Sequence, residues 1–345
     1  MQAETAAALG FALAGALALG ATPLAARVAA RTGFLDHPAG YKKHGRATPY
    51  LGGTAVLLAF AVPALLWGGL SDRFVAIALG AAALWIVGTI DDRVSLSPYL
   101  RVAVEALAAV GLWLGDVGWT LFSSDLLNLA LTLVWVIGVV NAFNLMDNLD
   151  GATGTVTIAV GVGIGAFALE HDDVALAAFG CALAGACAGF LRYNLARPSR
   201  IFLGDGGSMP IGFLAAAGAI AATSASDLGF GAVLCAGLIV GLVILDTTLV
   251  VISRRRRGIS LLTGGRDHLT HRLLAITGSP RAVAGTLAVF QLALCAIAVA
   301  AATSGRHAVS WAAAGTVVIG IVVITVLELR YSAPHTAAVP ARPSE

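Results

Sequence analysis

The chain has little charge and few cysteines for its 345 residues. Asp, Glu, Lys and Arg make up 12% of the sequence, against roughly 25% in soluble domains. Hydrophobic residues reach 58% and the mean hydropathy is +0.88, which excludes an ordinary soluble domain, and no nucleic-acid partner is expected. The four cysteines, Cys181, Cys187, Cys235 and Cys295, lie in apolar stretches without metal-site spacing, so neither a disulfide nor zinc is expected.

The chain also lacks long polar stretches. Apolar runs long enough to cross a bilayer as helices recur from end to end. We therefore predict an all-α, polytopic integral membrane protein with about eleven transmembrane helices by the length criterion. They lie near residues 6–26, 51–70, 74–90, 100–115, 126–143, 152–170, 174–191, 209–223, 229–252, 282–303 and 308–329. Residues 1–330 are expected to form one transmembrane domain, and residues 331–345 a disordered tail.

The distribution of basic residues predicts the orientation. Lys and Arg remain on the cytoplasmic side during insertion. With the amino terminus outside, all of the 21 basic residues except Arg73 and Arg306 fall on the inner side, whereas acids such as Asp116 and Glu170 fall outside. We predict that the amino terminus is outside, that the carboxyl terminus is cytoplasmic, and that the protein lies in the plasma membrane.

Five polar loops then share the cytoplasmic face. They are residues 36–53, the loop opening at Asp91-Asp92, residues 141–151, the segment from Arg192 to Ser208, and residues 254–272. Acids and amides at a bilayer boundary are costly to insert and are normally kept for a cation, a proton or a polar substrate. We expect the five loops to converge on one site.

The residue types in these loops are typical of a site for a metal-bound phosphate compound. Mg²⁺ prefers one or two carboxylates together with substrate phosphate oxygens. Phosphoryl transfer depends mainly on positioning and on neutralising charge. Gly204, Gly206 and Gly207 would let backbone approach a ligand, and a helix starting near Ser208 would point its amino end at an anion. The carboxylates are Asp91, Asp92, Asp147, Asp150 and Asp205, and the cations are Lys42, Lys43, His268, His271 and Arg272.

Each cluster also has an ordinary structural interpretation. Asp91-Asp92 can be solvated charges at a helix end, and the run from Arg254 to Arg257 is best explained by topology alone. His268 and His271 lack a third ligand for zinc. Glu105 and Asp246 lie inside apolar spans, where a functional role and a helix–helix hydrogen bond both remain open.

The order of these motifs resembles the polyprenyl-phosphate N-acetylhexosamine 1-phosphate transferases, of the glycosyltransferase family 4 type. The resemblance runs from Asp36 to about Leu273. It comprises the Asp-x-Pro loop with Lys42, Lys43 and His44, then Pro49 and Gly52-Gly53, the Asp91-Asp92 pair, the motif from Asn141 to Gly151, the turn from Gly204 to Ser208, and the loop from Asp267 to Leu273.

The resemblance implies transfer of a sugar 1-phosphate from a UDP-sugar to a polyprenyl phosphate, with release of UMP. Residues 1–330 would then be a transferase domain. Asp205 and Asp147 would bind Mg²⁺, for which Mn²⁺ can substitute. Asp91, Asp92, Asn144 and Asp147 would be catalytic, with Asp91 a candidate base. The substrate-binding residues would be Lys42, Lys43, His44, Asp150, His268, His271 and Arg272. Direct attack by the lipid phosphate and an aspartyl-phosphate route both remain open, and so does a homodimer.

The chain departs from the family pattern at Tyr41, where a basic residue is common, and at Asn148, where glycine is common. Its last loop reads His268-Leu-Thr-His271 instead of the adjacent histidines and Phe-Glu of the branch that uses UDP-MurNAc-pentapeptide. We therefore predict a UDP-N-acetylglucosamine donor, with the pentapeptide donor as the alternative. A transporter of anionic substrates is a remote alternative, because transporters place polar residues near the midplane within repeated helices.

Overall fold

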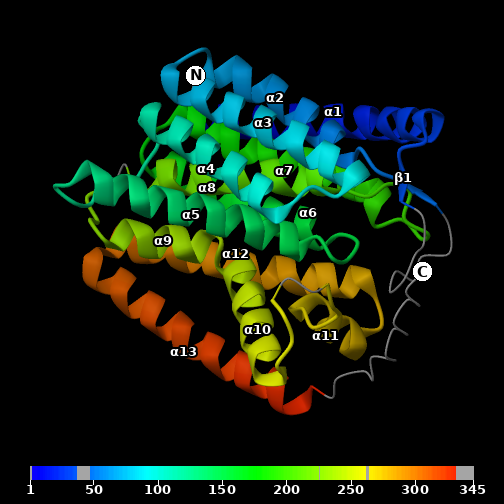
Figure 1. The fold of residues 1–345 in the computed structure, drawn as a ribbon. Helices are drawn as coiled ribbons and strands as arrows, with labels where there is room; N and C mark the ends of the chain where they lie inside the picture. The colour runs from blue at the N-terminus through cyan, green and yellow to red at the C-terminus, as the bar shows by residue number, and fades with distance from the viewer. Residues whose placement is uncertain (1, 37–46, 225, 262–263, 332–345) are drawn as a thin grey trace.

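The computed structural model describes residues 2–36, 47–224, 226–261 and 264–331, and it is almost entirely helical (Figure 1). The helices are α1 (Ala3–Thr32), α2 (Gly52–Gly68), α3 (Asp72–Val94), α4 (Pro98–Leu114), α5 (Asp125–Met146), α6 (Ala152–Glu170), α7 (Val174–Asn194), α8 (Asp205–Ser224), α9 (Gly231–Ile239), α10 (Gly241–Arg257), α11 (Leu269–Thr277), α12 (Pro280–Ser304) and α13 (Arg306–Arg330). Two short strands, β1 (Leu35–Asp36) and β2 (Thr48–Pro49), pair antiparallel. The prediction of an all-α polytopic membrane protein is confirmed.

Small residues let the long helices of the bundle pack closely. Helix α1 runs along α7, and a Cβ atom added at Gly185 of α7 would lie 2.1 Å from the carbonyl oxygen of Phe11. Gly161 of α6 and Gly180 of α7 make an equally close approach, because a Cβ at Gly161 would lie 2.4 Å from the Gly180 oxygen. Such contacts are typical of membrane helices, whose association depends on packing and hydrogen bonds.

The prediction of about eleven spans is not confirmed in number. In the described residues, 8 helices are long and apolar enough to cross a membrane, or 9 if the bent pair α9–α10 is one span. Each predicted stretch does contain a helix, but α2 and α4 have only 17 residues each. At 1.5 Å per residue such a helix is roughly 25 Å long, short of the roughly 30 Å hydrocarbon core. The stretch at 100–115 also contains Arg101 and Glu105, which lower its hydropathy.

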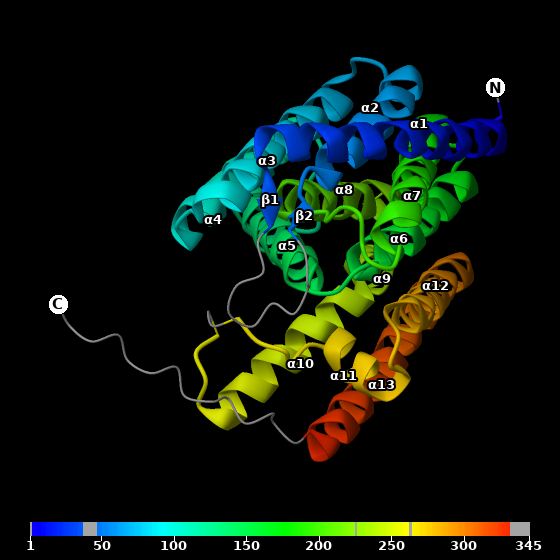
Figure 2. The same cartoon turned by 90° about the vertical axis from the view of Figure 1, so that its right-hand side faces the viewer.

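The chain turns sharply at Val240, where α9 and α10 meet at 81°. Figure 1 shows α10 running across the direction of the other long helices, and Figure 2 shows α10 and α11 below the bundle formed by α1–α8. The buried side chain of Gln291 on α12 donates from Nε2 to the oxygens of Leu238 and Ile239, at 3.1 and 2.7 Å. Its Oε1 accepts from the Leu242 N–H at 2.9 Å. A broken helix in an apolar medium needs such partners for its freed backbone groups, so Gln291 stabilises the break.

Replacing Gln291 by leucine is expected to lower the thermal unfolding temperature of the purified protein. Three backbone groups would lose their partner, and each unsatisfied buried group costs about 1–3 kcal/mol. Thr286→Val on the same helix is the control, because the Thr286 hydroxyl bonds only to the oxygen of Ala282 in its own helix. Equal unfolding temperatures for both variants would show that the break does not depend on Gln291.

Candidate active site

Asp92, in the last turn of α3, binds the amino end of α8. Its Oδ1 accepts from the Asp205 N–H at 2.8 Å and its Oδ2 accepts from the Gly206 N–H at 3.0 Å. A carboxylate at a helix amino terminus satisfies free N–H groups and interacts favourably with the helix dipole. Helix α8 therefore starts at Asp205, not near Ser208 as predicted from sequence, and the anion at its amino end is the protein's own Asp92.

A second set of contacts brings Asn144, Arg101 and Asp91 to Asp205. Asn144, near the end of α5, donates from Nδ2 to Oδ1 of Asp205 at 2.7 Å and to the Ser208 hydroxyl at 3.0 Å. Arg101, in the first turn of α4, donates from Nη1 to Asp91 at 2.8 Å and to Oδ2 of Asp205 at 3.4 Å. Four helices, α3, α4, α5 and α8, thus deliver polar side chains to one place.

Asp91 is not a solvated charge at a helix end, because its side chain is only 7% exposed. Asp205 keeps 31% of its side chain exposed and Arg101 keeps 24%. The sequence motifs single out Asp91, Asp92, Asn144 and Asp205 but miss Arg101 as a site residue. One feature of the sequence could have indicated Arg101: it lies in the first turn of α4, the helix that follows the Asp-Asp pair.

The glycines of this region allow close packing within the protein. A Cβ atom at Gly53 would lie 2.2 Å from the Cα of Gly207, and one at Gly88 would lie 2.3 Å from the oxygen of Asp205. Gly204 has φ +76, and a Cβ there would lie 2.5 Å from Oδ2 of Asp92. The first turn of α2 is also fixed here, because Gly52 and Gly53 donate to the oxygens of Phe202 and Leu203 at 3.0 Å each. These glycines hold Asp205 against α2 and α3.

Gly53→Ala is expected to reduce both activity and unfolding temperature. The added methyl group would overlap the backbone of Gly207, and overpacking a tight contact costs about 1–3 kcal/mol. Gly138→Ala on α5 is the matched control, because a Cβ there meets nothing within 4 Å. The packing argument fails if the two alanine variants behave alike in a thermal shift assay and in turnover.

The corner between α5 and α6 contains Asp147 and Asp150. Burial, together with the charges of Asp92 and Asp150, raises the pKa of Asp147 to about 7. Asn194 at the end of α7 holds this corner, since its Oδ1 accepts from the Gly151 N–H at 2.6 Å and its Nδ2 donates to Ile201 at 3.0 Å. Because the charge of Asp92 acts on Asp147, this corner lies near the carboxylates at the amino end of α8.

Asn148, the departure from the family pattern, contacts the histidine loop. Its Nδ2 donates to the oxygen of Leu145 at 2.6 Å, and its Oδ1 accepts from the Thr270 hydroxyl. The Thr270 oxygen also lies 3.2 Å from Nδ1 of His271. Burial, with help from the charge of Arg266, lowers the pKa of His271 to about 4, so His271 is neutral near pH 7. The third and fifth polar loops therefore meet, as predicted.

Glu105 and Asp246, the two acids predicted to lie inside apolar spans, both form hydrogen bonds between helices. Glu105 of α4 is 1% exposed and accepts from Nδ2 of Asn141 on α5. Asp246 of α10 is fully buried and contacts His268 and the backbone of Leu269. Of the two interpretations left open by the sequence, a functional role and a hydrogen bond between helices, the hydrogen bond is therefore found for both acids.

Arg254 and Arg272 have structural partners. Arg254 is 3% exposed and forms a double hydrogen bond with Asp267, from Nε at 2.9 Å and from Nη2 at 3.0 Å. The prediction that membrane topology alone explains Arg254 is therefore incomplete, because its guanidinium also forms a buried ion pair. Arg272 donates to Glu328 of α13 at 2.6 Å and lies 4.1 Å from the centre of the Tyr331 ring. Its predicted contact with substrate stays a prediction.

Lys42, Lys43 and His44, predicted to bind substrate, lie outside the described residues. Within the described part of the chain, no three His, Cys, Asp or Glu side chains are arranged as a ready-made metal site. The carboxylate oxygens of this site nevertheless suit Mg²⁺, which needs only one or two carboxylates beside substrate phosphates. The Asp91 and Asp205 carboxylates lie close together, because both contact the same Arg101 nitrogen.

The fold and the site together define a multi-pass membrane protein with a cluster of carboxylates, an amide and a guanidinium at the ends of its helices. Residues 74–223 match the model of the family described as glycosyl transferase family 4. The chain is 33% identical over 292 residues to a decaprenyl-phosphate N-acetylglucosaminephosphotransferase of Mycolicibacterium smegmatis, covering 74% of this chain and 72% of that protein. The chain belongs to glycosyl transferase family 4.

Two further relatives bear on the branch. An undecaprenyl-phosphate alpha-N-acetylglucosaminyl 1-phosphate transferase of Yersinia pestis is 28% identical over 287 residues, or 79% of this chain and 78% of the relative. A phospho-N-acetylmuramoyl-pentapeptide-transferase of Synechococcus elongatus is 35% identical over 239 residues, but these cover 62% of this chain and 64% of the relative. The resemblance inferred from the motifs is confirmed at the level of the family.

Proposed function

We propose that this protein transfers N-acetylglucosamine 1-phosphate from UDP-N-acetylglucosamine to a polyprenyl phosphate and releases UMP. The observation that carries the proposal is the convergence of Asp91, Asp92 and Asn144 on Asp205. Relatives that align over about three quarters of the chain are named for transfer of N-acetylglucosamine phosphate to undecaprenyl or decaprenyl phosphate. A lipid acceptor suits a multi-pass membrane enzyme, because its tail needs the bilayer.

Mg²⁺ would be held by Asp205 with help from Asp91 and, at the α5–α6 corner, Asp147. When bound, the ion supplies neutralisation of the negative charge on the phosphates. Asn144 holds the Asp205 carboxylate from one side at 2.7 Å, and Arg101 approaches it from the other at 3.4 Å. Asp92 is committed to the amino end of α8. Its role is therefore to place Asp205, which refines the catalytic role predicted for it.

In the reaction an oxygen of the lipid phosphate attacks the β-phosphorus of the UDP-sugar. The bond between that phosphorus and the bridging oxygen breaks, and the oxygen leaves with UMP. Arg101 would pair with an acceptor phosphate oxygen, since its guanidinium already lies between two carboxylates and is partly exposed. A lipid phosphate is ionised at neutral pH, so direct displacement needs no covalent enzyme intermediate and no strong base.

The donor is proposed to be UDP-N-acetylglucosamine and not the MurNAc-pentapeptide nucleotide. The relatives named for N-acetylglucosamine transfer align over a larger share of the chain than the pentapeptide transferase does. The histidine loop supports this choice, because Thr270 stands between His268 and His271 and binds Asn148. Asp150 and Lys42 are proposed to lie toward the nucleotide.

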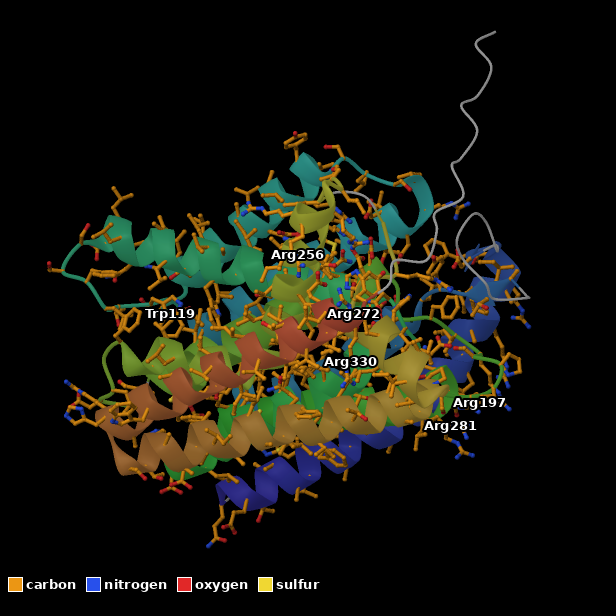
Figure 3. All side chains as sticks on the ribbon, turned by 90° about the horizontal axis from the view of Figure 1, so that it is seen from below. Trp119, Arg197, Arg256, Arg272, Arg281 and Arg330 are labelled. Atoms are coloured by element: carbon orange, nitrogen blue, oxygen red, sulfur yellow. The ribbon has the colours of Figure 1, made fainter. Side chains whose placement is uncertain are left out.

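We also propose that the site faces the cytoplasm, with the amino terminus outside, in the plasma membrane. Figure 3 supports a one-sided distribution of charge, since Arg197, Arg256, Arg272, Arg281 and Arg330 all lie on the same side of Trp119. Trp119 belongs to the connection between α4 and α5, which the basic-residue pattern places outside. Cysteine labelling at Ser123 and Ser199 from the two sides of sealed vesicles tests this orientation.

The decisive experiment measures UMP release by the detergent-purified protein. The assay contains undecaprenyl phosphate, Mg²⁺ and either UDP-N-acetylglucosamine or UDP-MurNAc-pentapeptide, with a chelator control. Turnover with the first donor alone, abolished by the chelator and restored by Mg²⁺, is the expected result. Turnover with the second donor alone would keep the reaction class and overturn the donor, and the absence of turnover with either would overturn the proposed function.

A further inference from the structure

Asp246 is a fully buried carboxyl group on α10, the second half of the broken helix. Its Oδ2 lies 2.8 Å from Nδ1 of His268, and its Oδ1 accepts from the Leu269 N–H at 2.6 Å. His268 immediately precedes α11 and is only 4% exposed. The carboxylate therefore fixes the imidazole and the first turn of α11 to α10 at the same time.

The contact with Nδ1 determines which ring nitrogen can meet a ligand. A carboxylate that accepts from Nδ1–H fixes the tautomer and the orientation of the ring. Nε2 of His268 makes no hydrogen bond to any residue that the structure describes. Neighbouring His271 is tied differently, through Thr270 to Asn148. His268 thus has one engaged nitrogen and one that is available.

The same loop is fixed from two further sides. Asp267, next to His268, forms the double hydrogen bond with Arg254 of α10. Thr270, two residues after His268, donates to Asn148 at the α5–α6 corner, beside Asp147. The imidazole is therefore held between α10 and the α5–α6 corner that contains Asp147.

We propose that Asp246 is a positioning residue for the transfer reaction: it holds His268 by Nδ1 so that Nε2 meets the sugar phosphate of the nucleotide donor. The inference rests on the proposed function of the site. The proposal gives the break between α9 and α10 a role in the reaction, because Asp246 lies on α10, the helix that follows the 81° turn. Asp246 itself touches neither substrate nor metal.

The test is a double-mutant cycle of Asp246→Asn and His268→Asn, read as kcat and KM in the UMP assay. Removing a carboxylate that orients a functional histidine typically costs about 10- to 100-fold in activity. Asp246→Asn is expected to lower kcat by that factor with little change in KM. His268→Asn is expected to lower kcat at least as much, and the double variant no further. Losses that multiply would overturn the inference, because Asp246 would then act independently of His268.

Asp173→Asn is the matched control. Asp173 likewise accepts from a backbone N–H at a helix start, that of Leu176 at 2.8 Å, and pairs with a cationic side chain, Arg73, at 3.1 Å. It lies at the other end of the bundle, before α7. Its replacement is expected to lower the unfolding temperature without changing kcat, so a comparable kcat loss in both variants would make the Asp246 effect merely structural.

A second measurement does not depend on activity. Nitrogen-15 NMR of histidine-labelled wild-type protein, with His268→Asn used to assign the signal, reports which nitrogen of His268 carries the proton. A protonated Nδ1 in the wild type is expected. An unprotonated Nδ1 would overturn the inference even if UMP release confirms the proposed function, whereas failure of UMP release with a protonated Nδ1 would overturn the function and leave the Asp246–His268 contact intact.

Discussion

Asp205→Asn is expected to reduce UMP release by on the order of 10²- to 10³-fold while leaving the protein folded, comparable to the loss of a preorganised electrostatic contact in other enzymes. The Asp205 carboxylate receives Asn144 on Oδ1 and Arg101 on Oδ2. The amide side chain keeps the shape but lacks the negative charge that would hold Mg²⁺. The backbone contact with Asp92 does not involve the substituted group, so α8 should still start at the same residue.

Asp72→Asn is the control for this variant. Asp72 also lies in the first turn of a long helix, α3, but at the end remote from the Asp91-Asp92 pair. Turnover and the Mg²⁺ concentration for half-maximal activity should be measured for both variants, together with thermal unfolding. Full turnover by a folded Asp205→Asn protein would refute the metal-binding role of Asp205. A loss that higher Mg²⁺ restores would support it directly.

Asp267→Asn is expected to destabilise the folded protein by about 3–5 kcal/mol, the range found when one partner of a buried ion pair is removed. The substitution would leave the guanidinium of Arg254, 3% exposed, without its anion. Arg257 would lose the same partner, to which it donates at 2.9 Å. Since α10 and the histidine loop meet at this pair, turnover should fall together with the unfolding temperature.

The same pair makes the wild type sensitive to acid. Burial alone would raise the pKa of Asp267, but the hydrogen bonds and charge of Arg254 lower it to about 2. A carboxyl group whose pKa is lower in the folded state stabilises the protein above its unfolded pKa, near 3.9, and loses that contribution as pH falls toward 2. The wild type should therefore lose unfolding temperature across this range, and Asp267→Asn should lose less of it.

Asp227→Asn separates this effect from the loss of any ion pair. Asp227 pairs with Arg306 at 2.9 Å, the distance found in the Arg254–Asp267 pair, but the side chains of Asp227 and Arg306 are both exposed. Exposed pairs contribute little to stability, so no measurable change is expected. Equal shifts for Asp227→Asn and Asp267→Asn in thermal unfolding would contradict the argument from burial.

The helices of this protein could be predicted from apolar run length, and so could the loops that form the site. Each predicted span contains a helix, and the motifs single out Asp91, Asn144 and Asp205. Run length was a poor guide to how many helices can cross a membrane, because α2 and α4 are only 17 residues long and α4 also carries Arg101 and Glu105. Lengths near that limit are decided by where the chain turns, which depends on tertiary contacts.

The roles of the individual residues within the site could not be predicted as well from the sequence. Asp91 and Asp92 are adjacent in sequence, yet one pairs with Arg101 and the other caps α8. The sequence predicts that Gly204, Gly206 and Gly207 let backbone approach a ligand, but it does not predict that glycines around Asp205 also make room for α2 and α3. Pattern reveals residue type and spacing, whereas the direction of a side chain depends on the helix that packs against it.

The sequence alone determined the class of this protein, the membrane setting, the order of the motifs and the family they resemble. These follow from composition and from residues close together along the chain, which act through local hydropathy and spacing. Only the tertiary structure decided that Arg101 joins Asp91 to Asp205, that Gln291 stabilises the break in α9–α10, and that Asp246 holds His268. These contacts join residues from different helices, and no local property of the sequence specifies which distant partners meet.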